Sequence, residues 1–346
     1  MSAIERARVG NRRGGIARFS DMPPAGLTYY PDSRPGITRR RRGSGFSYTA
    51  PDGTSIDDKR ERARIGALAV PPAYEKVWIS PKAHGHLQAT GFDVRERKQY
   101  RYHEKFREWR EARKYDDLAA FGEALPRIRR RIRQDLAGEA GERDFAIAAV
   151  IALLDRSAIR VGHADYASEN RTYGATTLTR RHLKFEGDEL KLTFRGKGNK
   201  LVRRQLRDRT LARVLGQLHD LPGKTLFTWT DDTGEPRSVT SDAVNARLSE
   251  YAGRDGITAK TFRTWAGSEA ALASALKLET ATIKALSEAA AERLHNTPTI
   301  ARNSYIHPRV IALTEVDAAG RQELLEKAAP VSGLRRAEEV LLHLLS

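Results

Sequence analysis

Four short segments of the chain carry residues of the kinds that phosphodiester chemistry needs. Without a metal ion, such chemistry needs a nucleophile, cations that neutralise the phosphate oxygens in the transition state, and an acid for the leaving oxygen. The segments are IRVGHADY at 159–166, RGKGN at 195–199, KTFR at 260–263 and HNTPTIARNSY at 295–305.

Arg160 in the first segment follows the run FAIAAVIALL at 145–154, which is apolar on nearly every face and predicts a buried helix. An unpaired charge at the end of such a helix is very costly. The guanidinium therefore either forms an ion pair, with Asp155 or Asp165, or points into a cleft. The sequence leaves both possibilities open.

Lys197 is predicted at the tip of a β-hairpin, because the alternating run LKLTF leads into RGKGN and KLVRRQL leads out. Gly196 and Gly198 relax the backbone on both sides, so that the turn can approach a phosphate backbone closely. A lysine gives up a proton more readily than an arginine, and crowding by other cations lowers its pKa. The alternative is an ordinary solvated lysine in a turn.

The other two segments predict helix starts. Thr258 is a candidate N-cap, and it places Lys260 and Arg263 on one face of the following helix, where they are either anion ligands or two solvated cations. Thr297 and the proline after it begin a short helix with Tyr305 near its end. The neighbours of this tyrosine are polar, so its phenol could meet a ligand.

Composition narrows the class of protein. The 346 residues include 61 Lys and Arg against 44 Asp and Glu, which gives a net charge of +17 and favours a polyanionic partner: nucleic acid first, an anionic membrane surface second. The absence of cysteine excludes disulfides, thiolate metal sites and a cysteine nucleophile. No apolar run is long enough to span a membrane. GKT at 223–225 lacks the upstream glycine of a phosphate-binding loop, and neither HExxH nor a dense acidic cluster is present, so we expect no nucleotide, metal or other cofactor.

The pattern along the chain predicts an α+β fold with two domains. Residues 1–28 are expected to form a flexible basic tail, and they favour a nucleic-acid arm over an organellar transit peptide. Residues 29–108 are predicted to form a small antiparallel sheet, with a hairpin turn at PDG (51–53) and a solvated basic stretch at Arg39–Arg42. Residues 109–346 are predicted to be mainly helical, with a strand pair at 189–206, helices near 241–252, 259–277, 280–294 and 298–306, and a helical pattern at 317–345.

In this order, the four segments resemble the catalytic set of the type IB DNA topoisomerases, in particular the compact poxvirus and bacterial branch. PPAYEKVWI and GHLQATGFDVRERKQYRYH resemble the DNA-recognition domain of that branch, so the resemblance covers roughly residues 44–310. It implies a β-rich amino-terminal domain and a helical catalytic domain with a short sheet, as in tyrosine recombinases and these topoisomerases.

The resemblance also implies roles for individual residues. Tyr305 is the implied nucleophile that joins the 3′ end of one strand, Arg160 and Arg263 bind the non-bridging oxygens, and Lys197 protonates the leaving 5′ oxygen. Residues in implied supporting positions are Tyr166 and Lys260 in the active site, and Lys98, Gln99, Tyr100 and Tyr102 on the DNA-recognition surface.

One position departs from the poxvirus pattern, which has histidine nine residues before the tyrosine. This chain has Asn296 there, as is familiar in the bacterial branch, with His295 one place earlier. Asparagine donates a hydrogen bond to a phosphate oxygen but carries no charge. We assign the position to Asn296, with His295 as the substitute.

The resemblance implies relaxation of supercoiled double-stranded DNA without ATP or metal, by a monomer that closes as a clamp through a joint near residues 104–112. A cytoplasmic, nucleoid-associated protein of a bacterium is the expected setting. Two other functions are open. A tyrosine recombinase uses a related catalytic set, although it usually has histidine where this chain has Lys260. A non-catalytic nucleic-acid-binding module would use the same residues as phosphate contacts.

Overall fold

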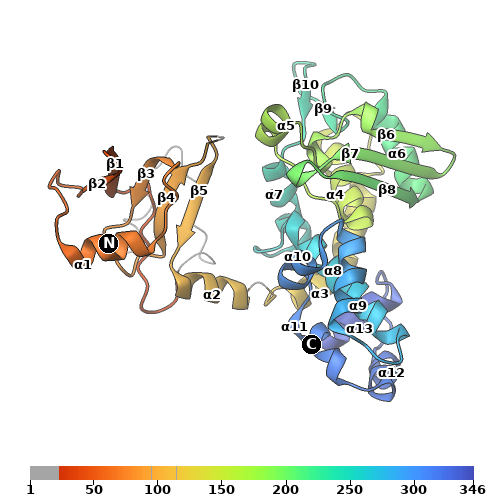
Figure 1. The fold of residues 1–346 in the computed structure, drawn as a ribbon. Helices are drawn as coiled ribbons and strands as arrows, with labels where there is room; N and C mark the ends of the chain where they lie inside the picture. Colours follow the sequence, from red (N-terminus) through yellow and green to blue (C-terminus); the bar gives the residue numbers. More distant parts are fainter. Residues whose placement is uncertain (1–22, 95, 114) are drawn as a thin grey trace, which may run out of the picture. The chain divides into compact units, whose positions relative to one another are not determined.

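The computed structural model describes residues 23–94, 96–113 and 115–346, and the chain divides into two compact units, residues 1–114 and 115–346 (Figure 1). The first unit therefore includes the helix α2 (Glu104–Arg113), within which the predicted boundary at 108/109 falls. Most of the predicted tail, 1–22, lies outside the described residues. At its end, Thr28 already pairs with Gly85 in an isolated parallel bridge.

The first unit is built on a five-stranded antiparallel sheet of order β2-β1-β3-β4-β5. Its strands are β1 (Ile37–Arg42), β2 (Gly45–Thr49), β3 (Glu75–Ile79), β4 (Leu87–Phe92) and β5 (Lys98–Tyr102). Alternate apolar residues of three strands pack against Ile65 of the helix α1 (Lys59–Ala67) and form the core of this unit. The sheet leaves β5 as an edge strand.

The first hairpin differs from the predicted one. The turn at 51–53 is present, but the segment after it makes only an isolated bridge between Thr49 and Ser55. The partner of β2 is instead β1, which contains the Arg39–Arg42 run. Arg40, Arg41 and Arg42 are exposed, as predicted for a solvated stretch, whereas Arg39 is partly buried. The guanidinium of Arg39 lies 4.2 Å from the ring centroid of Phe46 and donates hydrogen bonds to three backbone carbonyls. Packing of the arginine stem on an aromatic ring explains why so basic a run forms a strand.

The second unit is mainly helical and includes two small sheets (Figure 1). Its described helices are α3 (Leu118–Asp135), α4 (Arg143–Ser157), α5 (Ala164–Asn170), α6 (Arg209–His219), α7 (Ser241–Ala252), α8 (Ala259–Lys277), α9 (Ile283–Leu294), α10 (Pro298–Tyr305), α11 (Pro308–Ala312), α12 (Ala318–Lys327) and α13 (Arg336–Leu345). Its strands are β6 (Leu183–Glu186), β7 (Glu189–Arg195) and β8 (Leu201–Arg207) in one antiparallel sheet, and β9 (Thr228–Thr230) and β10 (Pro236–Ser238) in the other.

The predicted elements of this unit are largely confirmed. Helix α4 is buried around almost its whole circumference, as the run at 145–154 predicted. Helices α7 and α8 have the predicted bounds, whereas the C-terminal pattern is split into α12 and α13 by residues 328–335. The strand pair at 189–206 is present, but β6 adds a third strand that the sequence did not reveal. Among the helices that the structure describes, none combines the length and apolar character needed to cross a membrane.

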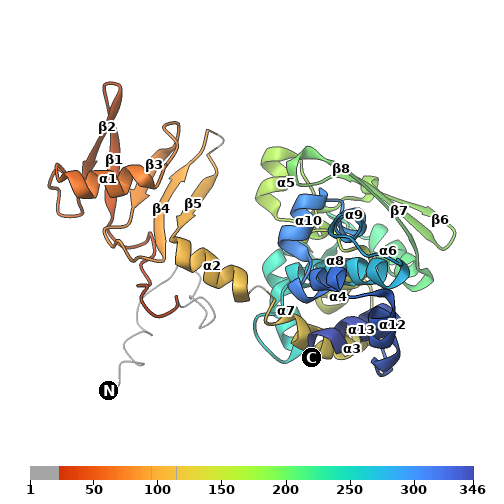
Figure 2. The ribbon, with the colours of Figure 1, turned by 60° about the horizontal axis from the view of Figure 1, so that its bottom comes forward.

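Two features of this fold position the residues of interest. Helix α10 packs against both α8 and α9 (Figure 2). Strands β7 and β8 form a hairpin whose last pair is Arg195 with Leu201, and Lys197 lies in the turn between them. Gly198 has φ of +74° in this turn, a conformation that glycine adopts without strain.

Candidate active site

Tyr305 is the last residue of α10. The helix begins at Thr297, whose Oγ1 accepts a hydrogen bond from the Ile300 amide at 3.3 Å, and Pro298 occupies its first turn. The tyrosine backbone is fixed to α8 by Ser268, whose hydroxyl donates to the Tyr305 carbonyl at 3.2 Å and accepts from the His307 amide at 3.0 Å. The phenol therefore extends from a backbone that Ser268 holds at the C-terminal end of α10.

Arg263 on α8 lies directly beside this tyrosine. Its guanidinium carbon is 5.0 Å from the centroid of the Tyr305 ring, and the side chain is only 3% exposed. It donates hydrogen bonds to the carbonyl oxygens of Ala158 and, at 3.2 Å, Leu294. Its Nε has no hydrogen-bond partner among the described residues, so this buried cation is incompletely satisfied.

Arg160 is positioned by a tight turn after α4. Helix α4 ends at Ala158 in the left-handed conformation, and Gly174 lies so close to Arg160 that a Cβ there would be 2.6 Å from the Arg160 carbonyl oxygen. The guanidinium donates to Oδ1 of Asn296 at 2.9 Å. The proposed ion pair with Asp155 was wrong, because Asp155 pairs instead with Arg129, at 2.8 Å.

Asn296 presents an unused donor. Because an arginine has only donors, its bond to Asn296 fixes the amide oxygen towards Arg160 and leaves Nδ2 on the other side. This Nδ2 is buried and has no partner among the residues described. A buried amide N–H without a partner, on a side chain that contacts the Arg160 guanidinium, can donate to an oxygen of a bound anion.

His295 points elsewhere. Its Nε2 lies 2.6 Å from the carbonyl oxygen of Arg203 on β8. Burial, together with the charges of Arg204 and Arg263, lowers the pKa of this imidazole and favours its neutral form. Arg160 thus contacts Asn296 and not its neighbour.

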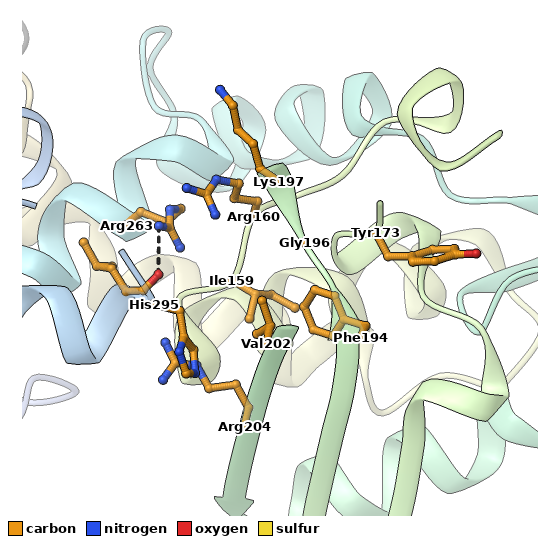
Figure 3. Close-up of a pocket in the computed structure, with 11 residues that line it drawn as sticks. Ile159, Arg160, Tyr173, Phe194, Gly196, Lys197, Val202, Arg204, Arg263 and His295 are labelled. Carbon is orange, nitrogen blue, oxygen red and sulfur yellow. Dashed lines mark hydrogen bonds between the residues drawn. The ribbon is translucent and has the colours of Figure 1, made fainter. Parts of the chain in front are cut away.

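One hollow in the surface brings several of these groups together, although Tyr305 and Asn296 are not among the residues that line it (Figure 3). Arg160, Arg263 and His295 line it together with Lys197, which reaches it from the exposed turn of the β7–β8 hairpin. Arg204 on β8 also lines it, a residue that sequence reasoning missed. Nothing local in KLVRRQL distinguishes this arginine from the one before it, because its partners lie almost ninety residues away.

The electrostatic setting favours negative charge at Tyr305. Burial alone raises the pKa of the phenol, but the charge and hydrogen bond of Arg263, with the charges of Arg160 and Lys260, bring this pKa below its usual value. Burial and the nearby Arg160 lower the pKa of Arg263 to about 10. Positive charge that no carboxylate among the described residues neutralises contributes to both pKa shifts. An anion placed beside these cations would therefore be stabilised.

The supporting residues occupy different places. Lys260 is exposed in the first turn of α8, after Thr258, whose amide donates to Thr261 Oγ1 at 3.1 Å. Tyr166 lies in α5, and its side chain is outside the described part of the chain. Sequence reasoning also missed Ser268, which has no motif around it.

The predicted DNA-recognition residues are on β5 in the first unit. Lys98, Tyr100 and Tyr102 alternate along the strand and share one face, where the two tyrosine rings stack with centroids 6.1 Å apart. Tyr100 is 49% exposed. Gln99 is on the opposite face and donates to Oδ2 of Asp93 at 3.0 Å, so the structure brings together three of these four side chains.

Comparisons with known proteins agree with this arrangement. Residues 103–304 match the family described as eukaryotic DNA topoisomerase I, catalytic core, and residues 45–93 match bacterial DNA topoisomerase IB, N-terminal domain. DNA topoisomerase 1B of Acanthamoeba polyphaga mimivirus is 28% identical over 234 residues, which cover 66% of this chain and 69% of that protein. DNA topoisomerase 1B of Vaccinia virus is 24% identical over 255 residues, covering 70% and 76%.

The first family match spans more than half of the 346 residues and ends one residue before Tyr305. It contains Arg160, Lys197, Arg263 and Asn296. Arg263 lies against Tyr305, Arg160 bonds to Asn296, and Lys197 shares the hollow with the two arginines. Sequence match and spatial arrangement thus agree, and the chain belongs to the type IB DNA topoisomerase family.

Proposed function

We propose that this protein relaxes supercoiled double-stranded DNA by cutting and rejoining one strand through Tyr305. The phenolic oxygen attacks a backbone phosphorus, a bond from phosphorus to tyrosine forms, and the bond to the 5′ oxygen breaks. The cut strand then has two ends: its 3′ end is joined to Tyr305 through a phosphotyrosyl link, and its 5′ end has a free hydroxyl. Because one phosphoester replaces another, the reverse attack rejoins the strand without ATP.

The observation that carries this proposal is the contact of Tyr305 with Arg263. A partly buried tyrosine whose pKa is lowered by a guanidinium 5.0 Å from its ring is set to act as an oxygen nucleophile. Tyr305 also packs against Ala158, Ala266 and Leu294, but a tyrosine that served only to fill this cluster would have a raised pKa.

The other groups are assigned by what they can do at a phosphate. Arg160 and Arg263 neutralise the non-bridging oxygens as charge builds up on them, and Nδ2 of Asn296 donates to one of the same oxygens. Lys197, on the exposed turn of the β7–β8 hairpin, protonates the departing 5′ oxygen. Lys260 adds positive charge near the phenol.

We assign duplex binding to both units. Lys98, Tyr100 and Tyr102 offer a cation and two stacked rings on an exposed edge strand, and Gln99 offers an amide from the other face. All five proposed catalytic residues come from a single chain, which supports a monomer that closes around DNA. The match of residues 45–93 to a bacterial domain supports action on DNA in a bacterial cytoplasm.

The test is relaxation of a plasmid without special sites, with EDTA present and ATP omitted. Wild-type protein should relax it, and denaturing electrophoresis with labelled duplex should reveal a protein-linked strand. Tyr305→Phe should abolish both while binding duplex with unchanged affinity. Tyr74→Phe, in the core of the first unit, serves as the matched control and should remain active.

Two results would contradict the proposal. Strict dependence on paired recognition sites would indicate a recombinase. Full retention of function by Tyr305→Phe would indicate a protein that binds DNA without cutting it.

A further inference from the structure

The C-terminal end of α9 is fastened to strand β8. Arg204 on β8 donates to the carbonyl oxygens of Glu292, at 3.4 Å, and Arg293. In the other direction, His295 reaches back to the carbonyl oxygen of Arg203 at 2.6 Å. Two consecutive residues of the strand are thus bonded to the last turn of the helix.

The backbone of His295 indicates that its side chain is needed. The residue follows the last turn of α9 with φ of +48° and ψ of +53°, the left-handed conformation in which helices usually place glycine. Histidine adopts it only at a conformational cost. Glycine would end the helix more easily but has no side chain that could reach β8. Histidine at this position therefore provides the imidazole that bonds to Arg203.

The bond of His295 has a defined direction. A carbonyl oxygen only accepts hydrogen bonds, so Nε2 of the neutral ring carries the hydrogen and donates it to Arg203. The lowered pKa of the ring is consistent with this neutral donor.

Arg204 is occupied by the helix and is not free for a substrate. Both of its terminal nitrogens bond to carbonyl oxygens at the negative end of the α9 dipole, and its Nε is buried without a hydrogen-bond partner among the described residues. Burial, with the charges of Arg293 and Arg263, lowers its pKa to about 10. Its contacts are those of a residue that holds two elements together.

The fastened elements carry two different parts of the proposed chemistry. Asn296 comes directly after His295 and bonds to Arg160. On the other side, Arg203 is the third residue of β8, and the turn with Lys197 comes just before that strand. Figure 3 shows Arg204 and His295 below this turn, on the wall of the hollow that Lys197 also lines.

We infer that His295 and Arg204 are positioning residues that hold the β7–β8 hairpin against the end of α9, so that Lys197 keeps a fixed place relative to Asn296 and Arg160. This role rests on the proposed function, because it acts through the transfer of a proton from Lys197 to the leaving oxygen. In this role both residues act through the placement of Lys197 and not by binding the phosphate.

The test compares single-turnover cleavage of two duplexes that differ in one atom. One has the natural 5′ oxygen at the cleavage site, and the other has a bridging 5′ sulfur, which leaves without a proton. His295→Gly removes the ring and suits the left-handed backbone, so the variant should fold. Ala69→Gly makes the same change to a left-handed residue in the first unit and is the matched control.

His295→Gly should cleave the oxygen duplex about tenfold to a hundredfold more slowly than wild type, the range expected for a misplaced catalytic group. It should cleave the sulfur duplex at close to the wild-type rate. Lys197→Ala should give the same pattern. The double variant should be no slower than Lys197→Ala alone on the oxygen duplex, because both changes act on one step. Arg204→Gln should reproduce the effect from the other side of the contact.

Two results would overturn the inference: an equal loss on both duplexes, which would place the residues in phosphate binding or in folding, and no loss on either. If wild-type protein forms no covalent adduct with either duplex, the proposed function itself fails, and the positioning role fails with it.

Discussion

At the scale of single residues, the site depends on positive charges that lie close to Tyr305 and that no nearby carboxylate in the described part of the chain neutralises. The cations that lower the pKa of this phenol come from three separate parts of the second unit: Arg160 after α4, and Lys260 and Arg263 on α8. Each should make a separable contribution.

Replacing Lys260 by glutamine should raise the pKa of Tyr305, because a charge that favours the phenolate is removed. The pKa can be measured as the difference between ultraviolet absorbance titrations of the variant and of the same variant with Tyr305→Phe. Lys327→Gln, at an ion pair on α12, is the control and should leave the midpoint in place. An unmoved midpoint in Lys260→Gln would remove this lysine from the site.

Asn296→Asp tests the unused amide donor. The substitution keeps an oxygen for Arg160 but replaces Nδ2 by a second oxygen, which repels a phosphate. Single-turnover cleavage should slow by about a hundredfold or more. A bridging 5′ sulfur should not restore the rate, because the defect lies in charge stabilisation. Restoration by sulfur would assign Asn296 to proton transfer instead.

The sequence identified the residues of this site better than it identified their partners. Arg160, Lys197 and Tyr305 are recognisable because each sits in a short motif. That Arg160 bonds to Asn296 and not to Asp155 depends on a contact across 136 positions, which no local pattern encodes. For the same reason, the link from His295 to β8 could not be predicted.

At the scale of elements, the tyrosine helix depends on a glycine of its neighbour. A Cβ on Gly267 of α8 would lie 2.8 Å from the Tyr305 carbonyl oxygen and 3.0 Å from its Cβ. Close packing of α10 onto α8 therefore requires the absence of a side chain there.

Gly267→Ala should separate α10 from α8 and slow cleavage by roughly tenfold to a hundredfold, because a small misplacement of a reacting group is costly. Gly216→Ala is the control. Gly216 lies within helix α6 with nothing within 4 Å of the added methyl group, so this variant should be as active and slightly more stable. Cleavage rates and thermal unfolding should be measured for both variants. Equal activity of Gly267→Ala and Gly216→Ala would contradict the requirement for close packing of α10 onto α8.

Elements with strong periodicity were predicted well, and elements defined by distant partners were not. The bounds of α7 and α8 agree with the pattern because each begins after a threonine and buries a regular stripe. Strand β1 was missed because its four arginines give no strand signal, and its stability comes from Phe46 and from carbonyls around residue 70.

At the scale of the molecule, the C-terminal helix holds the second unit together through a buried carboxylate. Glu338 of α13 is fully buried and accepts hydrogen bonds from Arg129 of α3, from Arg335 and from the indole of Trp265 on α8. Burial alone would raise the pKa of Glu338, but the bonds from the two arginines hold it at about 2. The last helix is thereby tied to the helix that carries Arg263.

A lowered pKa in the folded state means that this carboxylate stabilises the protein above pH 4.5, its ordinary pKa, and that the stabilisation is lost as the pH falls towards about 2. Glu338→Gln should therefore lower the free energy of unfolding at neutral pH by roughly 3–5 kcal/mol, the usual cost of breaking a buried pair.

The difference in the free energy of unfolding between wild type and Glu338→Gln should shrink as the pH falls from 4.5 towards about 2. Denaturant unfolding at a series of pH values measures it. Glu323→Gln, at an exposed ion pair, should change stability by less than about 1 kcal/mol. A difference between wild type and Glu338→Gln that stays constant down to pH 2 would contradict the argument.

The hollow gathers Arg160, Lys197, Arg204 and Arg263, and no aspartate or glutamate is among the described side chains that line it. Like charges held this close repel one another, so the packing around them must offset that repulsion whenever no anion does. Selection for higher thermal stability would therefore conflict with function at this hollow. The substitutions that would most relieve this repulsion are those that remove a guanidinium, and the proposed function predicts that they would also slow cleavage. Added robustness has to come from elsewhere in the molecule, such as its outer helices.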